Sequence, residues 1–258
     1  MGSLNLCQWL IDHKANVLSR DKFGRSPLIL AIWKGHPQVA SLLLKHGADF
    51  CLGDSSDNSP IHYAAAYGQP ELIVLLEKLG AKIDALNMWK LSPLNVAVQK
   101  GHLECVRILL QFKSINVNCV NHEGKSLLSL AIEHMVSQTP SLVKLLLDKG
   151  ADPTIADVTG NTPLHHLASY QLERDYCISK SAQKKLSNLV KSLKQRVATL
   201  LIAKGAKLDT MNIAKETPLY LAALAKNTSL FPLLAKSGLG SNGKILHLIA
   251  KHILDPNY

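Results

Sequence analysis

The chain has few aromatic residues, few acidic residues and no long apolar run, and each shortage limits what it can be. Aromatic residues make up 5% of its 258 residues. No apolar stretch approaches the roughly 18 to 20 residues that a membrane-spanning helix needs, so we expect no transmembrane segment. Lysine and arginine number 29 against 19 aspartates and glutamates, a formal net charge of +10. This excess suits an acidic protein, nucleic acid or an anionic membrane as partner, although a solvated basic surface explains it equally well.

Cysteine is scarce, and its pattern excludes two kinds of site. The number of cysteines is odd and no Cys-x-x-Cys pair occurs, so the sequence indicates neither a disulfide framework nor a zinc site. Reduced thiols are typical of a cytoplasmic or nuclear protein, and we expect that location, with no metal and no cofactor. We expect Cys7 and Cys105 to lie in the core. The five cysteines are Cys7, Cys51, Cys105, Cys119 and Cys177.

Motifs of the common enzyme classes are missing as well. The sequence has no Gly-x-Ser-x-Gly elbow, no Gly-x-x-x-x-Gly-Lys-Ser/Thr phosphate loop and no His-Glu-x-x-His zinc motif. His165 and His166 are adjacent, but with His134 they are too loosely spaced to indicate a metal site. We therefore predict a protein that is not an enzyme and has no catalytic residues.

A pattern of about 33 residues recurs along most of the chain. Its parts are a turn, Ser-Pro-Leu or a variant, Gly-His, and an apolar run that ends in Gly-Ala-Asp. The intervals between successive anchoring Ser or Thr residues are 33, 33, 34, 36 and 55, so the copies stay in register until the last interval. The anchors are Ser26, Ser59, Ser92, Ser126, Thr162 and Thr217.

This pattern resembles the ankyrin repeat over nearly the whole chain. The resemblance implies an all-α solenoid of stacked helix-turn-helix units with short β-hairpin loops, in which each repeat packs on its neighbours. We expect one monomeric array over residues 1–258, as a piece of a longer array. Its predicted parts are a partial repeat over 4–20, repeats starting near 21, 54, 87, 121, 157 and 212, and a degenerate terminal repeat over 242–258.

Local chemistry supports the predicted helices and turns. A Ser or Thr hydroxyl can cap the first helix of each repeat, and Pro is tolerated in the first turn. Asp57 and Lys90 stand where other copies have the turn glycine. The resemblance also implies a structural role for His62 and His165, which correspond to the histidine of the family's Thr-Pro-Leu-His tetrapeptide.

The last interval indicates an insertion within the fifth repeat, because 55 less 33 leaves 22 residues. Apolar residues recur at helical spacing between Leu186 and Leu201, so we expect a helical basic insertion over about 172–196 that lengthens the second helix. Its charge permits binding to nucleic acid or anionic lipid, and a solvated helix face is the alternative. The basic residues are Lys180, Lys184, Lys185, Lys191, Lys194 and Arg196.

The resemblance further implies where a partner binds. Ankyrin arrays expose the second, third, fifth, thirteenth and fourteenth positions of each repeat on a concave face. Large side chains that the fold does not need are concentrated at these positions in the first three full repeats, and such residues are candidate hot spots. The predicted partner-binding residues are Phe23, Arg25, Trp33, Tyr67, Met88 and Trp89.

Three interpretations of these side chains remain open. They can grip a peptide or protein, which would make the chain a non-catalytic interaction scaffold. They can pack on each other or on other parts of a longer array. They can also form a cage for a methylated ammonium, although the acidic residues that such a cage favours are few here.

Overall fold

The computed structural model describes residues 3–171 and 180–235. For residues 180–182 it describes the backbone but not the side chains. The chain divides into two compact units, Met1–Asn116 and Val117–Tyr258, and we describe each by itself. The predicted terminal repeat over 242–258 and the beginning of the insertion lie outside the described residues, as does Cys177. No helix in the described ranges is both long and apolar enough to cross a bilayer.

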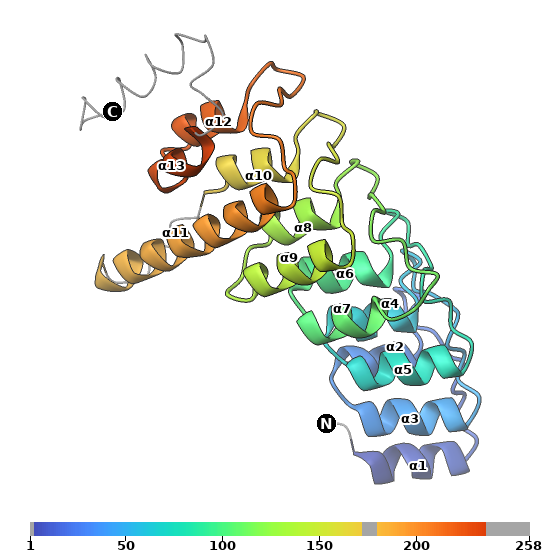
Figure 1. Ribbon diagram of the computed structural model, residues 1–258. Coiled ribbons are helices and arrows are strands. Elements are labelled where there is room, and N and C mark those ends of the chain that lie inside the picture. Colours follow the sequence, from blue (N-terminus) through green and yellow to red (C-terminus); the bar gives the residue numbers. More distant parts are fainter. Residues whose placement is uncertain (1–2, 172–179, 236–258) are drawn as a thin grey trace. The chain divides into compact units, whose positions relative to one another are not determined.

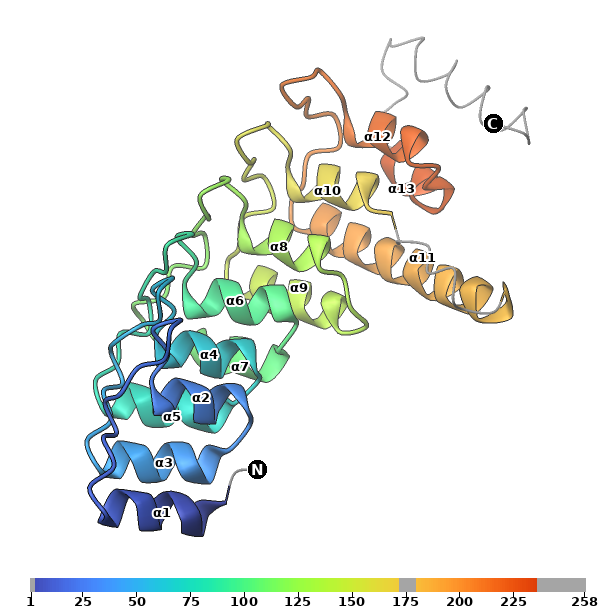
Figure 2. The same ribbon diagram turned by 180° about the vertical axis from the view of Figure 1, so that it is seen from behind.

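Unit 1 consists of paired helices. In Figures 1 and 2, α2, α4 and α6 form one layer, while α1, α3, α5 and α7 form the other. Each first helix packs against the second helix of its own repeat and against the first helix of the next. The helices are α1 (Leu4–Asp12), α2 (Pro27–Trp33), α3 (Pro37–Lys45), α4 (Pro60–Ala66), α5 (Pro70–Lys78), α6 (Pro93–Lys100) and α7 (Leu103–Leu109).

Unit 2 repeats the same pairing but with one long helix. The second helix of the fifth repeat, α11, is 24 residues long and extends past α9 and α10 (Figure 1). This helix covers residues 180–196 of the predicted insertion, and residues 172–179 lie outside the described part. The elements are α8 (Leu127–Glu133), α9 (Thr139–Asp148), α10 (Pro163–Ser169), α11 (Lys180–Ala203), α12 (Pro218–Leu224), the 3-10 helix η1 (Thr228–Leu230) and α13 (Phe231–Leu234).

Capping explains why the first helices begin where they do. The hydroxyl of Ser26 accepts a hydrogen bond from the backbone N–H of Ile29, and Pro27 occupies the first helical position. Ser126 caps α8 in the same way, through the N–H of Ser129, although no proline follows it. The cap alone therefore suffices to start a helix whose next turn is apolar and buried.

The hairpins are simpler than expected. Among the described residues no strand forms, and one isolated bridge joins Val120 to Ser126. The expected β-hairpins are therefore turns. In the first repeat, the side chain of Asp21 accepts the N–H groups of Phe23 and Arg25 at 2.9 Å each, and this bonding fixes the turn without a ladder. Neighbouring turns are joined by single backbone bonds, such as Ser55 N–H to Phe23 O at 3.0 Å.

The turn glycine position requires a left-handed backbone in every described repeat of unit 1. Gly24 has φ 74°, Asp57 has φ 61° and Lys90 has φ 56°. A Cβ added at Gly24 would lie 2.8 Å from Oγ of Ser55, so glycine also allows the close approach of the next turn there. Asp57 and Lys90 adopt a conformation that L-residues with a Cβ populate only at an energetic cost.

The two tetrapeptide histidines are buried and structural, as predicted. Nδ1 of His62 accepts the N–H of Ser59 at 3.2 Å, and its Nε2 donates to the carbonyl oxygen of Leu91 in the next repeat. His165 makes the equivalent bonds in unit 2. Burial lowers the pKa of both histidines, while their bonds to carbonyl oxygens oppose this shift. These neutral rings tie each first helix to the following turn.

Of the two cysteines expected in the core, one lies there. Cys105 is buried in α7, where burial raises the pKa of its thiol to about 11. Cys7 is only half-buried on α1, so the prediction that it belongs to the core is wrong. The physical reason is that α1 buries none of its nine residues.

Candidate partner-binding surface

Three of the predicted partner-binding residues contact one another in the first repeat. The guanidinium carbon of Arg25 lies 4.7 Å from the ring centroid of Phe23 and 4.6 Å from that of Trp33. Two lysines add to the group: Nζ of Lys22 is 5.1 Å from the Phe23 centroid, and Nζ of Lys34 is 3.9 Å from the Trp33 centroid. We call these five residues the ring–cation cluster. Each ring contacts two cations, and Arg25 is shared between the rings.

A carboxylate fixes the central cation of this cluster. Nη2 of Arg25 lies 2.6 Å from Oδ2 of Asp21, and Nε of the same guanidinium donates to that oxygen at 2.8 Å. The hydrogen bond from Arg25 lowers the pKa of Asp21 against a smaller opposing effect of burial. A cage for a methylated ammonium would need the faces of the Phe23 and Trp33 rings. The guanidinium of Arg25 already contacts both faces, so a ligand cation would have to displace it.

The second repeat contributes a pair of stacked tyrosines. The rings of Tyr63 and Tyr67 lie 6.3 Å apart with an interplanar angle of 12°, and Tyr67 is 45% exposed. Tyr63 donates its hydroxyl to Oδ2 of Asp54 at 2.7 Å. Burial alone would raise the pKa of Asp54, but this bond and the N–H groups of Asn58 and Ser56 hold it below its usual value. The same carboxylate and, above all, burial raise the pKa of the Tyr63 hydroxyl.

Sequence reasoning missed Tyr63, which occupies the tenth position of its repeat. The signal was present, because Tyr63 and Tyr67 are four residues apart and therefore share one face of a helix. The same position in the fifth repeat holds His166, which bonds to the opening aspartate of its own repeat at 3.0 Å. A polar ring at position ten thus supports the turn in both units.

The third repeat presents its large side chains on the turn. Met88 is 60% exposed and Trp89 is 42% exposed, compared with 52% for Phe23. The N–H of Met88 donates to the carbonyl oxygen of Ser56 at 3.1 Å, so this turn lies directly beside that of the second repeat. The predicted residues outside the first repeat are therefore accessible.

A hollow of 170 Å³ lies between α4 and α6 in unit 1. Tyr63 and Tyr67 form part of its wall, and Ala66 and Val96 leave room for it because their side chains are short. Its lining residues are Asn58, His62, Tyr63, Ala66, Tyr67 and Val96.

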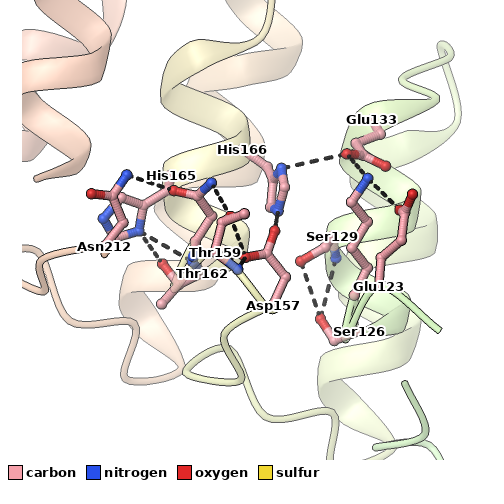
Figure 3. Close-up of polar contacts among 12 residues, drawn as sticks. Glu123, Ser126, Ser129, Glu133, Asp157, Thr159, Thr162, His165, His166 and Asn212 are labelled. Carbon is pink, nitrogen blue, oxygen red and sulfur yellow. Dashed lines mark hydrogen bonds and ion pairs between the residues drawn. The ribbon is translucent and has the colours of Figure 1, made fainter. Parts of the chain in front are cut away.

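Unit 2 has charged side chains at several of the corresponding positions of its fourth repeat. Nζ of Lys125 lies 2.8 Å from Glu123 and 2.7 Å from Glu133. Nδ1 of His166 is 3.5 Å from Glu133, and its Nε2 is 3.0 Å from Asp157, so a network of ion pairs joins the fourth and fifth repeats (Figure 3). The network contains three carboxylates and one lysine, so it keeps a net negative charge.

The basic insertion does not keep all its charges at the surface. Lys184, Lys185, Lys191 and Arg196 are exposed, but Lys194 is only 4% exposed. Its Nζ donates to the carbonyl oxygen of Tyr170 at 2.6 Å and to Oδ1 of Asn227 at 2.5 Å. Burial lowers the pKa of Lys194 to about 8. The prediction that Lys194 belongs to an exposed basic group is therefore wrong. Lys180 begins α11, and its side chain lies outside the described part.

Within the described ranges, no group of three or more His, Cys, Asp or Glu side chains is arranged to hold a metal ion. A hollow of 360 Å³ lies between α9 and α11, and Lys144 and Arg196 are among the residues that line it. Its remaining lining residues are all uncharged, and no catalytic pair is found among them.

Comparison with known proteins agrees with this architecture. The family model for ankyrin repeats (3 copies) matches residues 1–87, 61–157 and 94–178. YahD of Escherichia coli (strain K12), which is named as an ankyrin repeat protein, is 40% identical over 68 residues. That match covers 26% of this chain and 34% of YahD, so the chain spans about a third of that relative.

Two solved structures have the same fold. The ankyrin repeat domain of Bcl-3, a member of the IkappaB family, is 24% identical with a TM-score of 0.62, covering 84% of this chain and 86% of that one. An ankyrin repeat domain from Acinetobacter baumannii AYE is 29% identical with a TM-score of 0.61, covering 79% and 93%. Together with the paired helices and the match of the family model over residues 1–178, these likenesses show that the chain belongs to the ankyrin repeat family, whose repeats are generally protein–protein interaction modules.

Proposed function

We propose that this chain is a non-catalytic interaction scaffold that binds a peptide or protein partner on the concave face of unit 1. The residues proposed to contact the partner are those predicted from the sequence. The observation that supports the proposal is the exposure of large side chains on this face: Phe23, Tyr67, Met88 and Trp89 are each at least 42% exposed.

Exposed rings of this kind are costly unless something covers them. Trp and Tyr provide a large, rigid contact area and lose little conformational entropy on binding. The capped helices, the buried histidines and the turn aspartates described above account for the fold without any of these side chains. A bound partner would cover these side chains, and the 170 Å³ hollow beside Tyr67 could hold one side chain of that partner.

A double substitution, Trp33→Ala with Trp89→Ala, tests the surface. Partners captured by the wild-type chain are identified by mass spectrometry, and the affinity of each purified partner is then measured. We expect the double variant to lose on the order of 2 kcal/mol or more of binding free energy, because hot-spot aromatic residues contribute on this scale.

The matched control is Trp9→Ala, which removes a more exposed indole, 55% against 42% for Trp89, from the second-helix position of α1. Thermal unfolding of all variants establishes that the array remains folded. If the double variant binds its partners as tightly as the Trp9→Ala control does, the proposed surface is wrong.

A second candidate function rests on α11. This helix has no acidic residue in its 24 residues, and four of its basic side chains are exposed. Lys184 and Lys191 share one side of the helix and Lys185 and Arg196 share another, roughly 100° away, so the charges flank the solvent face and do not form one stripe. A phosphate backbone or an anionic lipid surface could contact both sides.

A salt titration with single-stranded DNA and with phosphatidylserine vesicles tests this second function. Affinity should fall steeply with ionic strength and be lost when Lys184, Lys185, Lys191 and Arg196 are changed to Gln. Lys194→Met serves as a control, because this side chain is buried and should not contact the ligand. Absence of binding at low salt would contradict the idea.

A further inference from the structure

We infer that the partner of unit 1 binds through acidic side chains placed next to apolar ones, and this inference rests on the function proposed above. It concerns the class of partner, which the family does not determine. The ring–cation cluster of the first repeat and the distribution of charge on the same face support it.

The ring faces of the cluster are already in contact with cations of the chain. Arg25 lies against both Phe23 and Trp33, and Lys34 lies 3.9 Å from the Trp33 centroid. A ring attracts a cation through the negative potential of its face, whereas its edge is positive. A cationic partner would have to displace the chain's own cations, while an anionic partner meets ammonium groups and ring edges and displaces nothing.

The charge within the cluster is not balanced. Lys22, Arg25 and Lys34 carry three positive charges, and Asp21 pairs with Arg25 as the carboxylate in contact, so the group keeps a formal charge of +2. Lys22 and Lys34 are both exposed and can reach a ligand. A carboxylate that bridges them would gain two charge-assisted hydrogen bonds.

Outside the cluster, the predicted concave face of unit 1 adds one basic side chain, Lys100, and no acidic one at the positions predicted to be exposed. At the second, third, fifth, thirteenth and fourteenth positions of the repeats starting at 21, 54 and 87, four side chains are basic and none is acidic. The fourth positions add Asp57 and Lys90, one charge of each sign. The basic residues are Lys22, Arg25, Lys34 and Lys100.

Apolar contacts belong to the same recognition. Tyr67, Met88 and Trp89 are exposed and uncharged. They are suited to leucine, phenylalanine or similar side chains of the partner. A segment that alternates acidic and apolar residues would therefore match the surface, with its acidic part toward the first repeat.

Selection of short random peptides displayed against the intact chain tests the inference. We expect the selected peptides to be enriched in Asp and Glu beside Leu, Phe or Trp. Fluorescence anisotropy of one labelled selected peptide then compares the wild type with the double variant Lys22→Gln and Lys34→Gln. The dissociation constant should rise about tenfold at low ionic strength, since two exposed charge contacts are lost.

The control is the double variant Lys45→Gln and Lys78→Gln, which removes the same charge from exposed positions near the ends of α3 and α5. It should change the dissociation constant by less than about twofold. Equal effects of the two charge variants, or selected peptides with no excess of acidic residues, would overturn the inference.

These outcomes can be separated from failure of the proposed function. Peptides without acidic residues that still require Trp33 and Trp89 would refute the acidic class and support the surface. Peptides that bind equally well to the Trp33→Ala, Trp89→Ala variant would refute the surface itself, and so would a selection that yields no binding peptide.

Discussion

Nε2 of His62 lies 3.1 Å from the carbonyl oxygen of Leu91, which is 29 residues later and belongs to the next repeat. His165 makes the same contact with Glu216 at 3.1 Å in unit 2. Each ring also accepts the N–H of its own N-cap residue. One neutral side chain therefore connects the N-cap and first helix of its own repeat to the turn of the next repeat. This coupling transmits stability from one repeat to the next.

The first prediction concerns His62→Asn. Asn95 occupies the equivalent position in the third repeat, where its Oδ1 accepts the N–H of Ser92, so the variant keeps the cap but is too short to reach Leu91. Leaving a part-buried carbonyl group without its donor should lower the free energy of unfolding by about 1 kcal/mol. Urea unfolding measures this. His46→Asn, at an exposed C-cap, is the control, and equal stability of the two variants would contradict the coupling.

The second prediction concerns mildly acidic pH. Burial lowers the pKa of His62 and His165 in the folded chain, so the unfolded chain binds more protons once the pH falls below about 6.5. Stability should be fully present above that pH and decline as the pH falls toward the folded pKa values, by at most about 1.4 kcal/mol per pH unit for each histidine. Urea unfolding at pH 7.5 and pH 5.5 measures it.

The variant His62→Asn provides the check on this assignment. It should show a weaker dependence on pH over the same interval, because one of the two responsible groups is gone. The lowered pKa values of Asp54 and Asp157 act only below about pH 4, where protonation of these carboxylates would remove further stability. An unchanged dependence in the variant would assign the effect to other histidines.

Much of the fold was predictable because the sequence of each repeat marks where its first helix begins and where its turn lies. A Ser or Thr followed by apolar residues starts every first helix, and the turn position tolerates only residues that can adopt positive φ. Asp57 was correctly assigned to that position even though it is not glycine. The lengthened α11 was predictable from one irregular interval and from apolar residues at helical spacing.

The side chains of the candidate sites were less predictable. Lys194 was grouped with the exposed cations by residue type, but it lies one turn from Val190 and from Val197 and Ala198, which are all buried, so helical spacing already placed it on the inner face. The stacking of Arg25 between Phe23 and Trp33 depends on rotamers and on the pairing with Asp21. No repeat pattern encodes such choices.

The third prediction follows from the buried ammonium of Lys194. Its pKa is lowered to about 8, so between about pH 8 and 10 the unfolded chain holds a proton that the folded chain releases. Stability of wild type relative to Lys194→Met should therefore increase with pH across this window, on the order of 1 kcal/mol between pH 7 and 9.5. Using the difference between the two proteins cancels the titration of Cys105 and Tyr63. A constant difference would mean that Lys194 stays solvated.

The fourth prediction compares two substitutions at the same position of the turn. Lys90 has φ 56°, so Lys90→Gly should relieve the left-handed conformation, an effect partly offset by the greater freedom of glycine in the unfolded chain. We expect a gain of about 0.5 to 1 kcal/mol in urea unfolding.

Gly160→Ala should act in the opposite direction and more strongly. Gly160 has φ 79°, and a Cβ there would lie 3.0 Å from the backbone N of Ile213, so the substitution combines an unfavourable conformation with a contact that the next turn cannot relieve without moving. A loss of more than about 1 kcal/mol is expected. The N–H of Ile213 bonds to the carbonyl oxygen of Thr159, so hydrogen exchange at that amide should accelerate in the variant and remain unchanged in Lys90→Gly. If Gly160→Ala is neutral, then the close approach of successive turns is not what requires glycine there.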